Sequence, residues 1–294
     1  MTVRGLVDYH LHTATSSDAH ATVAEYCERA AELGLVEIAI TNHMNLRTEK
    51  YHLSPEVLAG VWEEIQECQK RNRGLKVRLG LEVDYFEELK GEIAGALPEY
   101  EAAIGRKLDF VMGSAHEMDG VRFASKKTAH ELLVGADPVP IFRTFFGLMT
   151  EVVESGLFDI VAHPDLIRRF TGLHNPPVPF EVYREAAEGF IDTLVSHDVG
   201  IEINVKGLTH PVGEVYPSGE FLQTYLSACA AADRSPTITL GTDAHWPEHL
   251  GTHLDVGARM LQEMGVIEIT TFEERTRIPF RLPDLPTEPR GDAG

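Results

Sequence analysis

The chain has 294 residues, of which 43% are hydrophobic and 24% charged, as is ordinary for a globular protein with a sizeable core. Its 26 lysines and arginines against 46 aspartates and glutamates give a formal net charge of −20, which disfavours binding to nucleic acid or to anionic membrane surfaces. No signal-peptide pattern and no membrane-spanning apolar stretch is visible, so we expect a cytoplasmic protein.

The cysteines support the same expectation. Cys27, Cys68 and Cys229 are odd in number, far apart in the sequence and inside expected helices. We therefore expect neither a disulfide framework nor a thiolate zinc site, which fits a reducing compartment.

Short apolar runs alternate with helix-like segments along the chain. The expected strands cover residues 3–7, 36–41, 76–81, 108–112, 158–161, 199–205 and 237–240. The expected helices cover residues 22–33, 54–74, 87–104, 138–154, 180–196, 218–232 and 253–264, and two glycines and a proline make the limits of 87–104 loose. Residues 118–125 are expected to form a turn with a short strand or hairpin.

Seven strand-then-helix units in series predict a parallel sheet, either closed into a barrel or open and doubly wound. Candidate functional residues follow the first strand, the last strand and most of those between, and only a closed ring brings all these strand ends to one point. We therefore expect an α/β fold with a single barrel domain over residues 1–283. Residues 284–294, rich in proline, glycine and charge, are expected to form a flexible tail.

Histidines and carboxylates recur where the expected strands end. Alternate residues of an extended segment lie on one side, so the pairs His10/His12 and Asp243/His245 can each converge on one point. Imidazole and carboxylate groups are ligands that zinc, iron and manganese accept. The candidate metal ligands are His10, His12, Asp18, His43, Glu82, His116, His163, Asp243 and His245.

This set exceeds what one ion needs, so we expect two or three divalent ions, Zn, Fe or Mn, with Glu82 as a bridge between two of them. A lone histidine is more often a structural or surface residue than a ligand, and the remaining histidines lie in expected helices or loops. Of those, His20 and His210 could approach the mouth of a barrel. Glu82 and Asp243 could alternatively be helix-capping or surface acids.

The order of these motifs resembles the polymerase and histidinol phosphatase (PHP) superfamily over about residues 5–270. Within it, the chain looks most like the stand-alone histidinol-phosphate phosphatases. The residues that carry the resemblance are Asp8 to His12, Thr41 to His43, Gly80 to Glu82, Gly113 to His116, Val161 to Leu166 with Arg168, Ile201 to Asn204 with Gly207-Leu208, Tyr216 to Ser218, and Leu240 to His245 with Pro247-Glu248.

The resemblance implies a distorted (β/α)7 barrel, similar to a TIM barrel, and three metal positions. It implies that His10, His12, Glu82 and Asp243 hold one ion, that Glu82, His116 and His163 hold a second, and that Asp18, His43 and His245 hold a third. Three residues depart from the family pattern. Asn42 replaces the acid that is usual before the second-strand histidine, Lys206 stands where a small polar residue is common, and Glu117 replaces an apolar or aromatic residue.

The expected reaction is hydrolysis of L-histidinol phosphate to L-histidinol and phosphate, a step of histidine biosynthesis. We expect a hydroxide that bridges two ions to attack phosphorus while Arg168, with Lys206 as a second candidate, binds the non-bridging oxygens. Asp165, Glu117 and His245 are candidates for protonating the leaving group, and an acidic rim would favour a cationic one. The expected catalytic residues are Asp165, Arg168, Asp243 and His245, and the expected substrate contacts are Glu117, Arg168, Asn204 and Lys206.

Three other functions use the same residues. The first is hydrolysis of another small phosphate ester, such as a nucleotide or a sugar phosphate. The second is a nuclease or polymerase-associated module, which the charge of −20 disfavours. The third is metal binding without turnover. The expected partner is thus a small phosphate ester, with neither nucleic acid nor membrane, and no sequence feature points to a particular oligomeric state.

Overall fold

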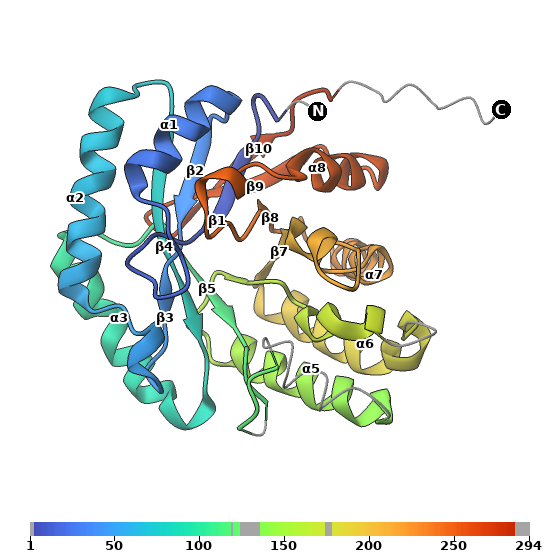
Figure 1. Ribbon diagram of the computed structural model, residues 1–294. Helices are drawn as coiled ribbons and strands as arrows, with labels where there is room; N and C mark the ends of the chain where they lie inside the picture. Colours follow the sequence, from blue (N-terminus) through green and yellow to red (C-terminus); the bar gives the residue numbers. More distant parts are fainter. Residues whose placement is uncertain (1–2, 119, 124–135, 174–177, 286–294) are drawn as a thin grey trace.

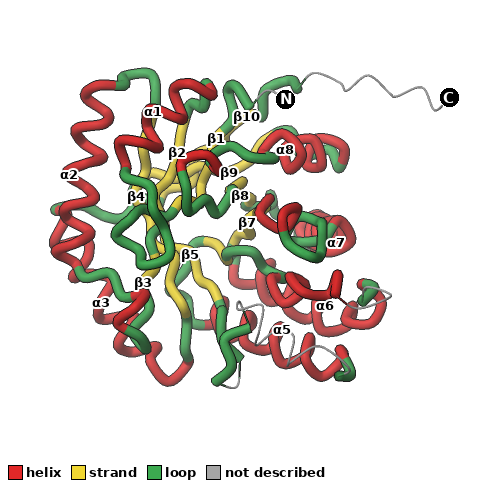
Figure 2. The backbone as a smooth tube through the Cα atoms, in the orientation of Figure 1, coloured by secondary structure: helices red, strands yellow, loops and turns green. Residues whose placement is uncertain are grey.

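A ring of parallel strands lies at the centre of the molecule, with the helices outside it (Figures 1 and 2). The structure, a computed structural model, describes residues 3–118, 120–123, 136–173 and 178–285. Neighbouring strands in the sheet follow the order β1 (Val7–Leu11), β2 (Glu37–Ile40), β4 (Lys76–Asp84), β5 (Phe110–Ser114), β6 (Ile160–Val161), β7 (Gly200–Asn204) and β8 (Ile238–Gly241). The two-residue strand β3 (His43–Met44) pairs with β4.

The first and last strands meet where the site residues begin. Leu11 and Ala244 form a parallel bridge, and the Ala244 carbonyl accepts a hydrogen bond from the His12 amide at 2.9 Å. The Tyr26 hydroxyl donates to the carbonyls of both His12 and Ala244, at 3.0 and 2.7 Å. The predicted seven-stranded, single-domain α/β barrel is therefore confirmed as a nearly closed ring.

The helices pack against the outside of the ring and agree closely with the predicted ranges. They are α1 (Val23–Leu33), α2 (Pro55–Arg71), α3 (Lys90–Ile104), α5 (Pro138–Glu154), α6 (Phe180–His197), α7 (Gly219–Ala231) and α8 (Leu254–Glu263). Short 3-10 helices are η1 (Glu49–Tyr51), η2 (Glu87–Leu89), η3 (Leu166–Leu173), η4 (Val205–Thr209) and η5 (Pro247–His249). The Thr22–Glu25 capping box forms as predicted.

Helix α3 is continuous, although the sequence contains residues that usually interrupt helices. Pro98 lies inside it and removes one backbone donor. Ile93, Leu97, Tyr100 and Ile104 are buried at helical spacing, and their packing outweighs the local preference of the proline. In the segment predicted as a turn or hairpin, Met118 and Val121 form an antiparallel bridge, and residues 119 and 124–125 lie outside the described part.

A hairpin that the sequence analysis missed covers the amino ends of the strands. Strands β9 (Glu268–Glu273) and β10 (Thr276–Arg281) pair antiparallel. The Phe272 amide donates to the Tyr9 hydroxyl at 3.0 Å. The Phe272 ring stacks on the Phe110 ring, with centroids 5.4 Å apart. The carboxyl ends of the strands therefore remain the open end of the barrel.

The cysteine expectation is wrong in this structure. Cys27 on α1 and Cys68 on α2 form a disulfide, with their Cα atoms 6.5 Å apart, whereas Cys229 is a buried free thiol. The two helices pack side by side, although 41 residues separate the two cysteines in sequence. Sequence spacing alone could not reveal this pair.

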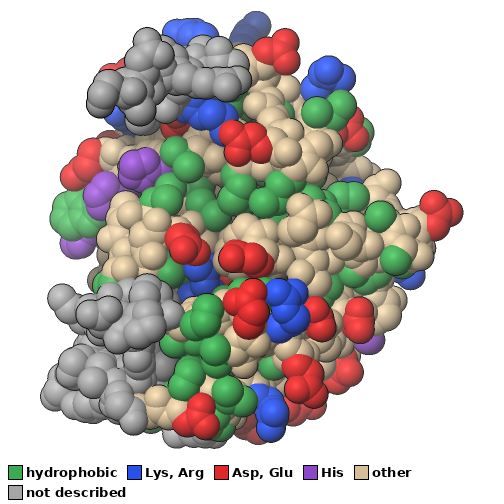
Figure 3. All heavy atoms as spheres, turned by 90° about the vertical axis from the view of Figure 1, so that its right-hand side faces the viewer, with side chains coloured by type: hydrophobic (Ala, Val, Ile, Leu, Met, Phe, Trp, Pro, Cys, Tyr) green, Lys and Arg blue, Asp and Glu red, His purple; other side chains and the backbone are tan. Residues whose placement is uncertain are grey.

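Acidic side chains lie at many places on the face shown in Figure 3, among scattered Lys and Arg side chains. This agrees with the net charge of −20. None of the described helices combines the length and the hydropathy needed to cross a bilayer.

Candidate metal centre

The nine predicted ligands come from remote parts of the chain and lie together at the carboxyl ends of the strands. His10 lies in β1, His43 in β3 and Glu82 in β4, while the others follow strands or lie in the first loop. All of them except Asp18 belong to three groups, and within each group the donor atoms lie within 4.8 Å of one another: His10, His12 and Asp243; Glu82, His116 and His163; and His12, His43 and His245. Their role as metal ligands stays a prediction.

The first group surrounds a point beside Glu82. His10 Nε2 and His12 Nε2 lie 3.0 Å apart, and Glu82 Oε2 is 3.3 Å from the former and 3.4 Å from the latter. Asp243 Oδ1 is 3.5 Å from His12 Nε2. Donor atoms around a tetrahedral zinc ion lie roughly 3.4 Å apart, given bonds of about 2.1 Å. The spacing of these side chains therefore fits an ion.

The other carboxylate oxygen of Glu82 faces the second group. Glu82 Oε1 lies 2.9 Å from His163 Nε2 and 3.5 Å from His116 Nε2. Since the two oxygens of one carboxylate face two different histidine groups, Glu82 has the geometry of a bridging ligand.

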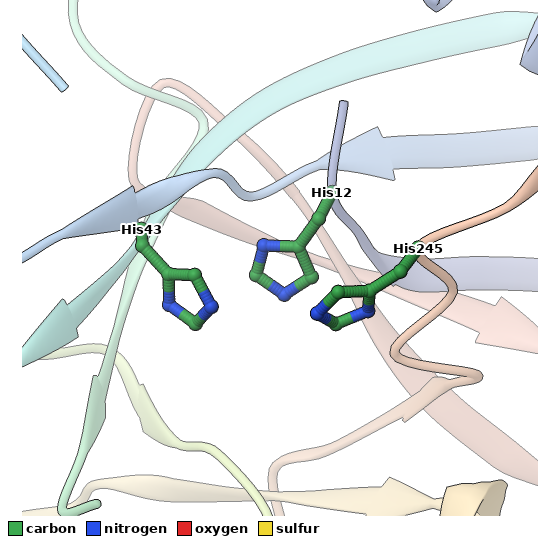
Figure 4. A group of neighbouring side chains, drawn as sticks. All are labelled: His12, His43 and His245. Carbon is green, nitrogen blue, oxygen red and sulfur yellow. The ribbon is translucent and has the colours of Figure 1, made fainter. Parts of the chain in front are cut away.

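The third group is the one drawn in Figure 4, where the rings of His12, His43 and His245 face a common space. Asp18 Oδ2 lies 3.7 Å from Nε2 of both His43 and His245. His12 thus borders two groups, whereas the resemblance implied only one. His12 Nδ1 is buried and makes no hydrogen bond to the described residues.

The charges of the cluster suit cations. Burial opposes ionisation of Glu82, but His43 and His10 hold its pKa well below the usual value. Burial and the neighbouring His43 and His245 lower the pKa of His12, so its ring is neutral. Burial also lowers the pKa of His10, but Glu202 and Glu82 more than reverse this. Ionised carboxylates that draw protons onto histidines will exchange those protons for metal ions.

Two buried carboxylates that the sequence analysis did not assign orient the histidines. Glu202 Oε1 lies 2.7 Å from His10 Nδ1, and Glu202 Oε2 accepts the His163 amide at 2.8 Å. Asp84 forms a short contact with His116 Nδ1, and although burial opposes it, this contact lowers the pKa of Asp84 to about 2. A carboxylate on the second ring nitrogen fixes a histidine for metal binding. Each lies two residues from another predicted site residue on its strand, which is the signal that could have found it.

Asp8 fixes the loop that carries Asp243. Its buried carboxylate accepts hydrogen bonds from the Thr242 amide at 2.9 Å, the Thr242 hydroxyl at 2.6 Å and the Gly251 amide at 3.3 Å. Asp243 itself has φ of 51°, a conformation that a non-glycine residue adopts only when its surroundings hold it.

Asn42, one of the departures from the family pattern, makes three hydrogen bonds to the first loop. Its side-chain oxygen accepts the Thr13 amide at 2.7 Å, and its nitrogen donates to the hydroxyls of Thr13 and Thr15, both at 2.8 Å. Asn42 therefore holds the first loop, which leads to Asp18.

A cavity of about 570 Å³ opens above the ligands. Lys50, Arg122, Arg169 and Lys206 line it, against the ligand carboxylates Asp18, Glu82 and Asp243. The described lining, with four cationic side chains beside three predicted ligand carboxylates, is therefore not the acidic rim that we expected. A larger groove of about 880 Å³ beside α7 and α8 contains none of the predicted site residues.

Arg168 does not line the cavity, and the prediction that it binds phosphate loses its geometric basis. It is buried, its guanidinium donates to Asp165 at 3.1 Å and to the Val215 carbonyl at 3.3 Å, and it pairs with Glu214. Asp165 is fully buried and also accepts the Ser218 amide, and neither residue lines the cavity.

Of the other three predicted substrate contacts, only Lys206 lines the cavity. Lys206 lines the cavity and its ammonium donates to the Asp243 carbonyl at 2.5 Å. Asn204 is buried, where it accepts the Lys206 amide and donates to Glu202. Glu117 pairs with Arg47 at 2.6 Å and lines a separate cavity of about 210 Å³. The cavity-lining residues missed in the sequence are Lys50, Tyr51, Arg122, Arg169, Trp246 and His249, and His210 approaches the mouth as expected.

The profile of the PHP domain family matches residues 8–206, which include seven of the nine predicted metal ligands. The other two, Asp243 and His245, follow β8. A probable histidinol-phosphatase of Deinococcus radiodurans is 29% identical over 279 residues, covering 94% of this chain and 99% of the relative. A histidinol-phosphatase of Lactococcus lactis is 24% identical over 278 residues, covering 90% and 94%.

Two solved structures with the same fold are also described as histidinol phosphatases. Histidinol phosphate phosphatase from Lactococcus lactis, in complex with zinc, L-histidinol and phosphate, superposes with a TM-score of 0.76 at 21% identity, covering 93% of this chain and 98% of that one. A putative histidinol phosphatase from Listeria monocytogenes gives a TM-score of 0.72 at 20% identity, covering 85% and 99%. These likenesses confirm the predicted fold.

Proposed function

The chain belongs to the PHP domain family, and on that premise we propose that it is a metal-dependent phosphomonoesterase that hydrolyses L-histidinol phosphate. The observation that carries the proposal is the convergence of three donor groups on Glu82 and His12 beneath one cationic cavity. The names of the relatives agree with this activity.

Two or three divalent ions, Zn, Fe or Mn, held by the nine predicted ligands would neutralise the phosphoryl oxygens and activate a water molecule. The protein's contribution is to hold the ligands before the ions arrive. Glu202 and Asp84 fix the rings of His10 and His116, and Asp8 fixes the loop of Asp243. Such preorganisation removes the cost of reorienting the site during the reaction.

The cavity walls bind and orient the ester. Arg169 and Lys206 both line the cavity, and we assign to them the non-bridging phosphoryl oxygens. Of the three residues considered as proton donors for the leaving group, only His245 lines this cavity. Water adds to phosphorus, the ester P–O bond breaks, and the alcohol leaves with a proton. Asp243 contributes as a ligand held between His12 and Lys206.

The substrate is a small ester and not nucleic acid. The cavity of about 570 Å³ has room for a phosphoryl group together with a leaving group of the size of histidinol. The proposal includes a cytoplasmic site of action.

A second candidate substrate class is favoured by one wall of the cavity. Lys50 Nζ lies 4.8 Å and the Arg122 guanidinium 4.1 Å from the ring centre of Tyr51, whose edge meets His43. These two cations favour a phosphate ester that carries an additional anionic group, such as a sugar or nucleotide bisphosphate.

A substrate panel tests the proposal. The metal-stripped enzyme is reloaded with Zn, Fe or Mn, and phosphate release is measured from L-histidinol phosphate, AMP, glucose 6-phosphate and fructose 1,6-bisphosphate. The highest kcat/KM is expected for L-histidinol phosphate, and His163→Asn should abolish it while exposed His197→Asn should not. Absence of release from every ester with any metal would overturn the proposal, and preference for the bisphosphate would select the second class.

A further inference from the structure

An exposed tryptophan stands at the mouth of the metal cavity. Trp246 is 41% exposed and lines the cavity beside His245 and His249. The exposed large hydrophobic residues in the described ranges are Val57, Val139, Trp246 and Ile267, and Trp246 alone among them borders this cavity. An indole left in water at the entrance of a polar site offers apolar area that a ligand can cover.

The position of the indole is fixed before any ligand binds. Trp246 directly follows His245 and precedes η5 (Pro247–His249), for which it is the N-cap. The His20 ring stacks on the indole, with centroids 3.8 Å apart and planes 27° apart. The His20 amide also donates to the His245 carbonyl at 2.8 Å, which ties the two loops together. His20 therefore covers one face of the indole and restricts its rotation.

The other aromatic side chain of the cavity is engaged differently. Tyr51 has the cationic groups of Lys50 and Arg122 over its ring. Because two cations already lie over the Tyr51 ring, a further cationic ring would be repelled there. Among the described residues, no lysine or arginine lies over the Trp246 ring, and tryptophan gives the strongest attraction to cations among aromatic residues.

We propose that Trp246 is a specificity-determining residue whose indole stacks on a planar, cation-forming ring of the leaving group. For the substrate proposed above, on which this inference rests, that ring is the imidazole of histidinol. Trp246 takes no part in breaking the P–O bond. It would hold the leaving group at the mouth, while Arg169, together with the ions when they are bound, would hold the phosphoryl group.

Tryptophan fluorescence tests the stacking of a ligand on Trp246. The chain has two tryptophans, so one substitution leaves Trp246 as the single indole. Trp62 lies on α2, where the Arg106 guanidinium is 4.9 Å from its ring centre. The Trp62→Phe holoenzyme therefore reports on Trp246 alone. L-Histidinol should quench this emission saturably, the ringless amino alcohol 2-amino-1-propanol should not, and Trp246→Phe, which retains Trp62, should give no response. An unchanged emission in Trp62→Phe at saturating L-histidinol would overturn the proposal.

Selectivity gives the second readout. The ratio of kcat/KM for L-histidinol phosphate to that for glycerol 3-phosphate should fall about three- to tenfold in Trp246→Ala, mainly through KM, and Trp246→Phe should recover most of it. An unchanged ratio would contradict the proposal. If the wild-type enzyme released phosphate from neither ester while quenching persisted, the proposed function would fail and the stacking site would stand.

Discussion

Glu202 Oε1 lies 2.7 Å from His10 Nδ1, although 192 residues separate the two in sequence, and both side chains are fully buried. The pair joins β7 to β1 across the barrel. Glu202→Gln removes the charge that orients the ring, so metal affinity should fall about 10- to 100-fold. Competition with a chromophoric chelator measures this, and Glu188→Gln on the exposed face of α6 is the control. Equal zinc affinity in Glu202→Gln and wild type would show that the pair does not support the metal site.

Substitutions of two neighbouring arginines should affect different properties, the activity in one case and the stability in the other. Arg169 lines the cavity, so Arg169→Ala should lower kcat/KM about 10- to 100-fold and weaken inhibition by inorganic phosphate, with little loss of stability. Arg168→Ala leaves the buried Asp165 without its partner and should reduce the free energy of unfolding by roughly 3–5 kcal/mol. Steady-state kinetics and urea unfolding separate the two. If Arg168→Ala alone weakened phosphate inhibition, our assignment of the phosphate-binding arginine would be wrong.

His210 should make the fold sensitive to acid. Burial, aided by the charge of Arg169, lowers the pKa of His210 to about 3. The unfolded chain takes up this proton near pH 6.5 and the folded protein does not, so stability falls as pH drops from about 6.5 towards 3. The slope from this group is below about 1.4 kcal/mol per pH unit, because the ring is partly exposed.

Urea unfolding at several pH values measures this slope. His210→Gln removes the titrating ring and keeps a group that can meet the Tyr216 hydroxyl, which lies 2.9 Å from His210 Nδ1. The variant should therefore lose less stability than wild type between pH 6.5 and 4.5, with exposed His197→Gln as the control. Parallel curves for wild type and His210→Gln would refute the burial argument.

The disulfide between α1 and α2 predicts a definite thiol count. The unfolded, unreduced protein should show one reactive thiol, from Cys229, and the reduced protein three. Because the bond closes a loop of about 40 residues, replacing Cys27 and Cys68 with serine should cost roughly 2–4 kcal/mol of stability. Thiol titration and thermal unfolding test both. Three thiols in the unreduced chain would restore the interpretation made from the sequence.

The sequence predicts the location of those site residues whose place depends only on where a strand ends. Since strand ends of a parallel barrel meet at one rim, residues such as Glu82 and His163 could be placed together from the strand pattern. The phosphate-binding arginine could not. Arg168 and Arg169 lie in η3 (Leu166–Leu173), and successive residues of a 3-10 helix point about 120° apart. A shift of one residue therefore exchanges a buried ion pair for a cavity wall.

The missed hairpin has a similar local cause. Strands β9 and β10 are joined by Glu274 and Arg275, whose φ angles are 47° and 68°. Two-residue turns of this kind usually contain asparagine, aspartate or glycine, and these residues give no such signal. The hairpin depends instead on contacts with Tyr9 and Phe110, which are remote in the sequence.

Anomalous X-ray scattering from crystals of the zinc-loaded protein tests the central claim most directly. We predict two or three peaks roughly 3.5–4 Å apart, with Glu82 between two of them and His12, His163 and Asp243 within bonding distance. Peaks confined to surface histidines, with none between Glu82 and its neighbours, would contradict the account.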